Sequence, residues 1–262
     1  MKITANGISM NYTLDGPVGA PVVTLSHSLA TTLAMWEPQL KALTARWRVL
    51  AYDTRGHGGT DAPRGGYSLE QLADDAQALL LALGIQRTHW VGLSMGGMIG
   101  QTLALKAPAL FASLSLCDTS SRIPPEAKPL WDERVHTAET KGMEPLVEPT
   151  LARWFTAPFR QKGGAVVETV RAMIRSTPPA GYIGCCQAIS GLNLTDRIGA
   201  IELPTLIIVG EEDQGTPVAA SKVMNEKIRG SELVILKSAA HLANMEQPEA
   251  FTSALTGFLG KV

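Results

Sequence analysis

The chain has 262 residues, of which 45% are hydrophobic and 18% charged, and its formal net charge is -1. This size and balance are typical of one α/β core with room for an inserted lobe. A nearly neutral chain without a basic run offers nothing to bind nucleic acid or a membrane surface. The sequence has no signal-like or membrane-spanning apolar run, and its three cysteines make neither a disulfide framework nor a zinc motif. We therefore expect a cytoplasmic protein.

The first part of the chain alternates strands and helices. Residues 1–16 alternate apolar and polar side chains, which predicts an antiparallel start. The continuous apolar runs that predict buried strands are 22–26, 48–53, 89–93 and 111–117. Residues 68–83 have apolar side chains at helical spacing, with Ser68 as the N-cap and Gly84 beyond the end. This alternation predicts a mostly parallel sheet with helices on both faces.

The alternation breaks over residues 121–193, where no strand-like run occurs. Helical stretches are expected around 129–141, 144–154 and 165–176. Strands resume at 204–210 and 232–236, with helices over 217–228 and 248–260. The prediction is an α/β core made of residues 1–120 and 194–262, interrupted by a helical cap at 121–193.

The stretch Gly92-Leu93-Ser94-Met95-Gly96 has the form G-x-S-x-G. An apolar strand leads into it and a helix-like segment leads out. A sharp turn from strand to helix holds the serine hydroxyl at the carboxyl end of a sheet, and glycines flank it where side chains would collide. The motif predicts Ser94 as a nucleophile, although a glycine-rich turn that happens to contain serine would look similar.

A serine nucleophile needs a base, and the base needs an orienting acid. Of the five histidines, His241 alone follows the last strand, after an acid at the end of the preceding strand. This reproduces the chain order Ser, acid, His. Three adjacent acids, Glu211, Glu212 and Asp213, compete for the acid's role. Asp213 is preferred for its short side chain, and Asp118, which ends an earlier strand, is the reserve.

The negative charge that develops on a carbonyl oxygen needs two backbone donors. One is expected from Met95, directly after the nucleophile. The other is expected from the loop after residues 22–26, with Leu29 as the preferred residue. Backbone donors do not depend on side-chain type, so the sequence locates this loop better than it locates the residue.

These stretches resemble the α/β-hydrolase family over essentially the whole chain, and within it bacterial 3-oxoadipate enol-lactonases in particular. Supporting stretches are Tyr52 to Gly58, Gly92 to Gly97, Ser28-Leu29 and, in the insertion, Trp131 with Arg134, Arg153 to Thr156, and Gly181-Tyr182. The resemblance implies a cofactor-free hydrolase of a small, negatively charged γ-lactone under a cap. One departure is Ala30, where such enzymes usually carry glycine.

Three cap residues are expected to bind substrate. Trp131 and Arg134 are three residues apart, so on a helix they share a face, and Trp154 completes the set. Arginine can grip a carboxylate through two hydrogen bonds. The alternative is that Arg134 pairs with Asp132, Glu133 or solvent.

The sequence thus predicts a serine hydrolase that opens a small anionic lactone, with Ser94, His241 and Asp213 as the triad. It needs no cofactor and no metal, its partner is a small ester or lactone, and a homo-oligomer is compatible with it. A carboxylesterase or aryl esterase with the same machinery is the nearest alternative. A ligand-binding protein without turnover is the alternative from another class.

Overall fold

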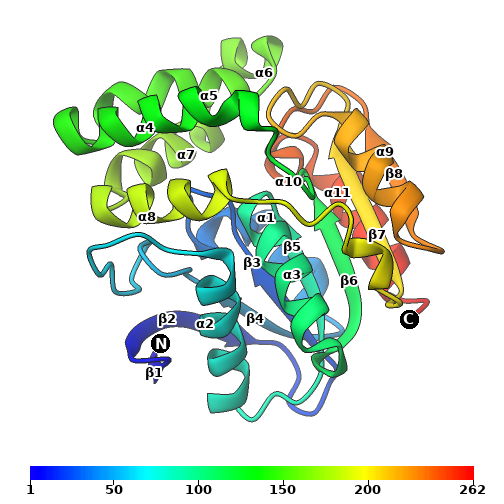
Figure 1. The fold of residues 1–262 in the computed structure, drawn as a ribbon. Coiled ribbons are helices and arrows are strands. Elements are labelled where there is room, and N and C mark those ends of the chain that lie inside the picture. The colour runs from blue at the N-terminus through cyan, green and yellow to red at the C-terminus, as the bar shows by residue number, and fades with distance from the viewer.

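One eight-stranded sheet runs through the computed structural model, which describes all of residues 1–262 (Figure 1). The strands are β1 (Lys2–Ala5), β2 (Ile8–Asp15), β3 (Val22–Ser26), β4 (Arg48–Tyr52), β5 (Thr88–Leu93), β6 (Phe111–Cys117), β7 (Thr205–Gly210) and β8 (Glu232–Leu236). Their order is β1-β2-β4-β3-β5-β6-β7-β8, with β2 antiparallel to β1 and β4 and all later pairs parallel. The expected α/β architecture with a mostly parallel sheet is confirmed.

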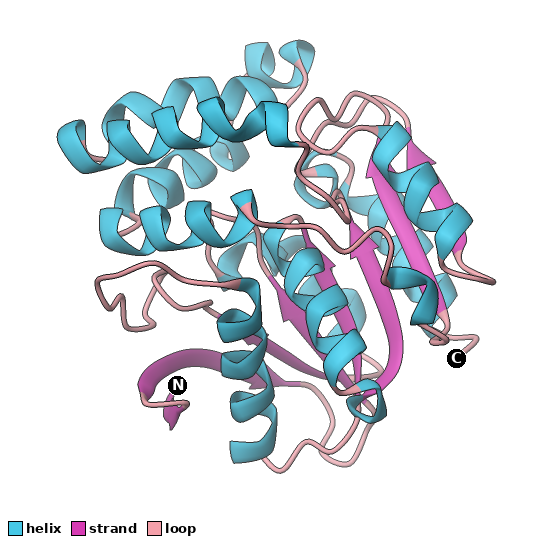
Figure 2. Cartoon of the chain, viewed as in Figure 1, coloured by secondary structure: helices cyan, strands magenta, loops and turns pink.

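Helices cover both faces of the sheet (Figure 2). The core helices are α1 (Glu37–Thr44), α2 (Leu69–Ala82), α3 (Met95–Lys106), α9 (Val218–Lys227), α10 (Ala243–Glu246) and α11 (Pro248–Leu259). Helices α2 and α3 pack together on one face, and α1 and α11 on the other. The predicted cap of α2 is present, since the Ser68 side chain accepts from the Gln71 N–H. None of the helices is long and apolar enough to cross a bilayer.

The segment that the sequence analysis assigned to a cap lies above the carboxyl edge of the sheet (Figure 1). Its helices are α4 (Lys128–Lys141), α5 (Val147–Trp154), α6 (Ala157–Lys162), α7 (Ala165–Ser176) and α8 (Pro179–Ser190). The two ends of the segment meet where Arg122 and Asn193 form an isolated bridge. The amide of Ile123 donates to the Leu192 carbonyl there, at 3.0 Å.

Helices α1, α6, α8 and α10 were not predicted from the sequence. The reason is clearest for α8, whose sequence PAGYIGCCQAIS contains glycines and no charge. Seven of its residues are buried, among them Gly181, Tyr182 and Cys185. A helix buried around most of its circumference lacks the polar face on which periodicity analysis depends.

The parallel register brings six loops to one edge of the sheet. They follow β3, β4, β5, β6, β7 and β8. Ligands of open α/β sheets bind outside the carboxyl ends of the strands. The fold therefore collects Ser94, Asp213 and His241 at this edge although they are far apart in the sequence.

Candidate functional site

Ser94 lies at the sharp turn between β5 and α3. Its backbone has φ 54° and ψ -114°, a conformation that is rare for a residue with a side chain. A Cβ at Gly92 would clash with the backbone of Gly96, and one at Gly96 would clash with the backbone of Ser26. The two glycines therefore allow strand, turn and helix to approach closely enough to hold Ser94 in this strained position. Its side chain lines a pocket beneath the cap.

His241 lies in the loop after β8 and lines the same pocket as Ser94. Its Nδ1 donates to Oδ2 of Asp213 at 2.8 Å. Asp213 also accepts from the amides of Gly215 and Thr216, at 2.8 and 3.0 Å, and from the Thr216 hydroxyl at 2.6 Å. Burial works to raise the pKa of Asp213, but the His241 charge and these hydrogen bonds outweigh it and hold the pKa below its usual value. The ionised carboxylate orients the imidazole with Nε2 free to accept a proton.

The structure separates the competing acids. Glu211 and Glu212 are exposed, whereas Asp213 is buried against His241. Asp118, the reserve candidate, is fully buried after β6 and accepts from the Gly210 amide at 2.8 Å through Oδ1, while its Oδ2 has no partner. Burial and the nearby Asp213 raise the pKa of Asp118 well above its usual value. Asp213 is the carboxylate that hydrogen-bonds His241.

In the loop after β3, every amide of residues 28–31 except that of Leu29 donates to an acceptor in the protein. The Ser28 N–H donates to Sδ of Met35, the Ala30 N–H donates to Nε2 of His57 at 2.9 Å, and the Thr31 N–H donates to the Ser28 carbonyl. The Leu29 N–H has no acceptor in the protein, and Leu29 lines the pocket. Met95, the first residue of α3, has no intrahelical acceptor for its N–H either. The two free donors thus belong to the residues expected from the sequence.

Two buried imidazoles tie this loop to the loop after β4. His57 accepts from Ala30, and His27 accepts from the Thr54 amide through Nε2 at 2.9 Å. Accepting at Nε2 requires both rings to be neutral. Burial, and then the neighbouring His27, lowers the pKa of His57 to about 3, and burial lowers the pKa of His27.

This pair predicts loss of stability in mild acid. The unfolded chain protonates histidine near pH 6.5, whereas folded His57 stays neutral down to about pH 3. The unfolded state therefore binds more protons between these values, and the free energy of unfolding falls as the pH falls, by up to about 1.4 kcal/mol per pH unit for each such histidine. Urea unfolding between pH 7 and 5 should show a weaker dependence on pH for His57→Gln than for wild type. His136→Gln, at an exposed position, is the control; equal slopes for all three proteins would contradict the expectation.

The pocket beneath the cap has a volume of about 480 Å³. Three arginines line it, Arg122, Arg134 and Arg153, and no aspartate or glutamate does. Two other arginines of the cap are neutralised: Arg175 pairs with Glu144, and Arg171 pairs with Glu148 and Glu168. The pocket therefore carries uncompensated positive charge, which favours an anionic ligand.

All three predicted cap residues line this pocket. The Arg134 guanidinium lies 4.5 Å from the centre of the Trp131 ring, and its buried Nε has no hydrogen-bond partner. No ion pair joins Arg134 to Asp132, which pairs instead with Lys128. The Trp154 ring lies 6.0 Å from the ring of His241, centre to centre.

The sequence analysis did not assign a role to Arg153, which precedes Trp154 on α5. It donates to the Thr150 hydroxyl at 3.1 Å, and burial, then the neighbouring Arg134, lowers its pKa. Arg122 and Tyr182 also line the pocket and were not predicted as site residues. Arg153 lies on α5, Tyr182 on α8 and Arg122 at the bridge to Asn193, so only the tertiary structure brings these side chains together. No group of three or more histidine, cysteine or acidic side chains is placed to hold a metal ion.

Comparison with known proteins is consistent with this arrangement. Residues 21–248 match the α/β hydrolase fold family. The chain is 33% identical to 3-oxoadipate enol-lactonase 1 of Acinetobacter baylyi over 100% of its own length and 97% of that protein. Among solved structures, an enol-lactonase from Burkholderia xenovorans superposes with a TM-score of 0.96 at 38% identity, covering 99% of this chain and 100% of the other. A thermophilic esterase from Thermogutta terrifontis, with malate bound, superposes with a TM-score of 0.93 at 31% identity. The match covers 100% of this chain and 98% of the other.

Proposed function

Since this chain belongs to the α/β-hydrolase family, we propose that it is a serine hydrolase that opens a small anionic γ-lactone, of the 3-oxoadipate enol-lactone type, through an acyl-enzyme. The observation that carries the proposal is the pairing of His241 with buried Asp213 beside the strained Ser94, in a pocket lined by arginines and no acid. The similarity to enol-lactonases supports the same class of substrate.

The proposed reaction proceeds in two halves. In the first, Ser94 Oγ attacks the lactone carbonyl while Nε2 of His241 takes its proton, and Asp213 stabilises the imidazolium. The Leu29 and Met95 amides stabilise the oxyanion. When the tetrahedral intermediate collapses, the ring C–O bond breaks and His241 protonates the leaving oxygen, which stays attached to the acyl chain. In the second half, water attacks the acyl-enzyme with His241 as base, and the free acid leaves.

The pocket supports a small substrate with its own charge. A cavity of about 480 Å³ lies at the low end of the range for ligand sites. A carboxylate in such a site needs compensating charge, because an unpaired buried carboxylate is costly. Arg134 and Arg153 supply two adjacent guanidiniums on the cap. The related Thermogutta esterase has malate bound, which supports a small carboxylic acid as a ligand of this kind of protein. We assign residues 121–193 the role of the cap that holds the charged end.

Replacing either cap arginine should lower kcat/KM for anionic substrates and not for neutral ones. Losing one partner of a buried charge contact costs roughly 2–4 kcal/mol, so Arg134→Met should lower kcat/KM on the anionic lactone about 30- to 1,000-fold. Arg153→Met should act in the same direction, and the double variant should lose less than the sum, since both arginines hold one carboxylate. Hydrolysis of neutral phenyl acetate should be nearly unchanged in each.

The matched control is Arg175→Met, which removes an exposed arginine that pairs with Glu144 on the cap surface. Arg175→Met should leave kcat/KM unchanged for both substrates. Equal losses on the lactone and on phenyl acetate would assign Arg134 a structural role. No loss on either substrate would favour a general carboxylesterase or aryl esterase with the same triad.

Two assays test the proposal as a whole. Purified protein is given 3-oxoadipate enol-lactone beside a panel of neutral esters, and the enol-lactone should have the highest kcat/KM. An activated aryl ester should release a burst of chromophore equal to the enzyme concentration. The absence of both turnover and burst would favour the remaining alternative, a ligand-binding protein on this fold.

A further inference from the structure

His57 lies behind the oxyanion loop, buried and out of reach of a ligand in the pocket. It is fully enclosed and does not line the pocket. Its Nε2 nevertheless accepts the Ala30 N–H, one peptide unit beyond the free N–H of Leu29. A hydrogen bond at this point fixes the orientation of the peptide that follows Leu29.

That orientation is one that Ala30 would not adopt unaided. Its φ is 56°, in the left-handed region, which costs an alanine roughly 1–2 kcal/mol. Such conformations persist only where the surroundings over-determine them. Here the surroundings are the bond to His57 and the Thr31 N–H bond to the Ser28 carbonyl. An alanine in this conformation depends on such support more than a glycine would.

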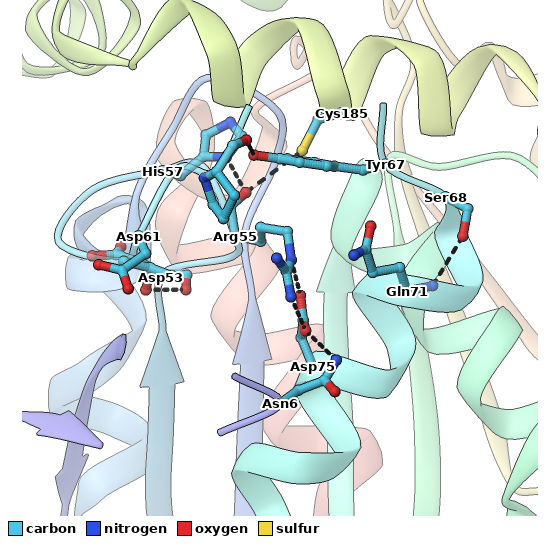
Figure 3. Close-up of polar contacts among 12 residues, drawn as sticks. Asn6, Asp53, Arg55, His57, Asp61, Tyr67, Ser68, Gln71, Asp75 and Cys185 are labelled. Carbon is cyan, nitrogen blue, oxygen red and sulfur yellow. Dashed lines mark hydrogen bonds and ion pairs between the residues drawn. The ribbon is translucent and has the colours of Figure 1, made fainter. Parts of the chain in front are cut away.

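The same histidine is anchored on its other side within its own loop after β4, and the cap contacts that loop. Its Nδ1 donates to the Arg55 carbonyl at 3.3 Å, and Cys185 Sγ of α8 donates to that carbonyl at 3.7 Å. Figure 3 shows Cys185 reaching from α8 toward this loop, while the Arg55 side chain points to Asp75 on α2. The two ion-pair hydrogen bonds between Arg55 and Asp75 measure 2.6 and 2.7 Å and are buried. His57 therefore has a rigid base.

We propose that His57 is a positioning residue of the oxyanion hole: by accepting the Ala30 N–H from a rigid, cap-contacting loop, it keeps the Leu29 N–H directed into the pocket. The proposal rests on the proposed function, in which the Leu29 amide binds the oxyanion. It assigns His57 no contact with substrate, so removing its acceptor should weaken binding of the tetrahedral state and leave binding of the ground state alone.

Two substitutions test the hydrogen bonds of the two ring nitrogens separately. His57→Gln places an amide oxygen near the position of Nε2 and so retains an acceptor for Ala30. His57→Asn reaches only the position of Nδ1, so it retains the donor to the Arg55 carbonyl and loses the acceptor. Removing a single oxyanion donor costs about 100- to 1,000-fold in kcat. We expect a loss of this size for His57→Asn on phenyl acetate, and a loss below about tenfold for His57→Gln.

The second readout is binding of an aryl boronic acid, whose tetrahedral adduct with Ser94 places an oxygen in the oxyanion hole. Its affinity should fall by the same factor as kcat in His57→Asn, while KM for phenyl acetate stays within about threefold. His89→Gln is the control, because His89 is also buried but bonds Ser113 on the sheet. It should change none of these quantities. If His57 had only a structural role, His57→Asn would lower thermal stability, but kcat and the affinity for the boronic acid would not fall by the same factor.

The outcomes distinguish the two proposals. If wild-type protein neither hydrolyses esters nor binds the boronic acid at Ser94, the hydrolase assignment fails. If wild type does both and the two His57 variants behave alike, the hydrolase assignment stands and the role of His57 is wrong. Should His57→Asn fail to fold, nitrogen NMR of wild-type His57 decides. The proposal requires a proton on Nδ1 and none on Nε2, and the opposite tautomer overturns it.

Discussion

Ser94→Ala is expected to lower kcat/KM by four to six orders of magnitude, with the fold intact. Loss of the nucleophile removes the acyl-enzyme route and leaves only what binding and the oxyanion donors contribute over water. The backbone at Ser94 is held by the amide of Ser94 donating to the Cys117 carbonyl at 2.8 Å and by the Thr119 hydroxyl donating to the Ser94 carbonyl at 2.7 Å. Neither contact involves the Ser94 side chain, so the elbow should survive the substitution.

The measurement is steady-state hydrolysis of phenyl acetate and of the enol-lactone, with circular dichroism to verify the fold. Labelling by a fluorophosphonate, detected by mass spectrometry, should disappear at the same time. The control is Ser120→Ala, which removes another hydroxyl from the pocket lining and should keep most of the activity. A Ser94→Ala protein that retained more than about a tenth of wild-type kcat/KM would contradict the nucleophile assignment.

Asp213→Asn is the second large effect, an expected loss of about 10⁴ in kcat. The carboxylate accepts four hydrogen bonds, from Gly215, from the amide and hydroxyl of Thr216, and from His241. An asparagine in the same place can present its amide N–H₂ to His241. The imidazole would then accept at Nδ1 and carry its proton on Nε2, where it cannot take the proton of Ser94.

Three substitutions serve as comparisons. Glu211→Gln and Glu212→Gln change exposed acids next to Asp213 in sequence and should be mild. Asp118→Asn keeps an acceptor for the Gly210 amide and removes a buried acid whose pKa is already raised by burial and by Asp213. It should therefore retain most of the activity. A larger loss for Asp118→Asn than for Asp213→Asn would exchange the roles of the two aspartates.

The order of the strands along the chain was predictable from sequence because buried parallel strands are short, continuous apolar runs. The turn between strand β5 and helix α3 could be recognised from the sequence. Close approach of the backbones at this turn requires glycine at fixed positions, here Gly92 and Gly96 on either side of Ser94. The chain order of Ser94, Asp213 and His241 followed from the same reading. Helix α8 left no such signal, because its burial removes the polar face.

Distances between loops were decided only by the tertiary structure. The sequence offered Glu211, Glu212 and Asp213, and it preferred Asp213 only for its short side chain. The fold buries Asp213 against His241 and exposes the other two. It likewise proposed Leu29 for an oxyanion donor without a means of excluding its neighbours. The acceptor for the Ala30 amide comes from His57, 27 residues away, and hydrogen bonds between such distant residues leave no periodicity in a sequence.

The positive charge of the pocket was also decided only by the tertiary structure. Arg134 could be proposed from its spacing to Trp131, because residues three apart on a helix share a face. Arg153 and Arg122 come from other segments, and nothing in their local sequence separates them from arginines such as Arg175, which pairs with Glu144 on the cap surface. Whether a charge is neutralised depends on which side chains the fold places around it, and that is a property of packing rather than of any one stretch of chain.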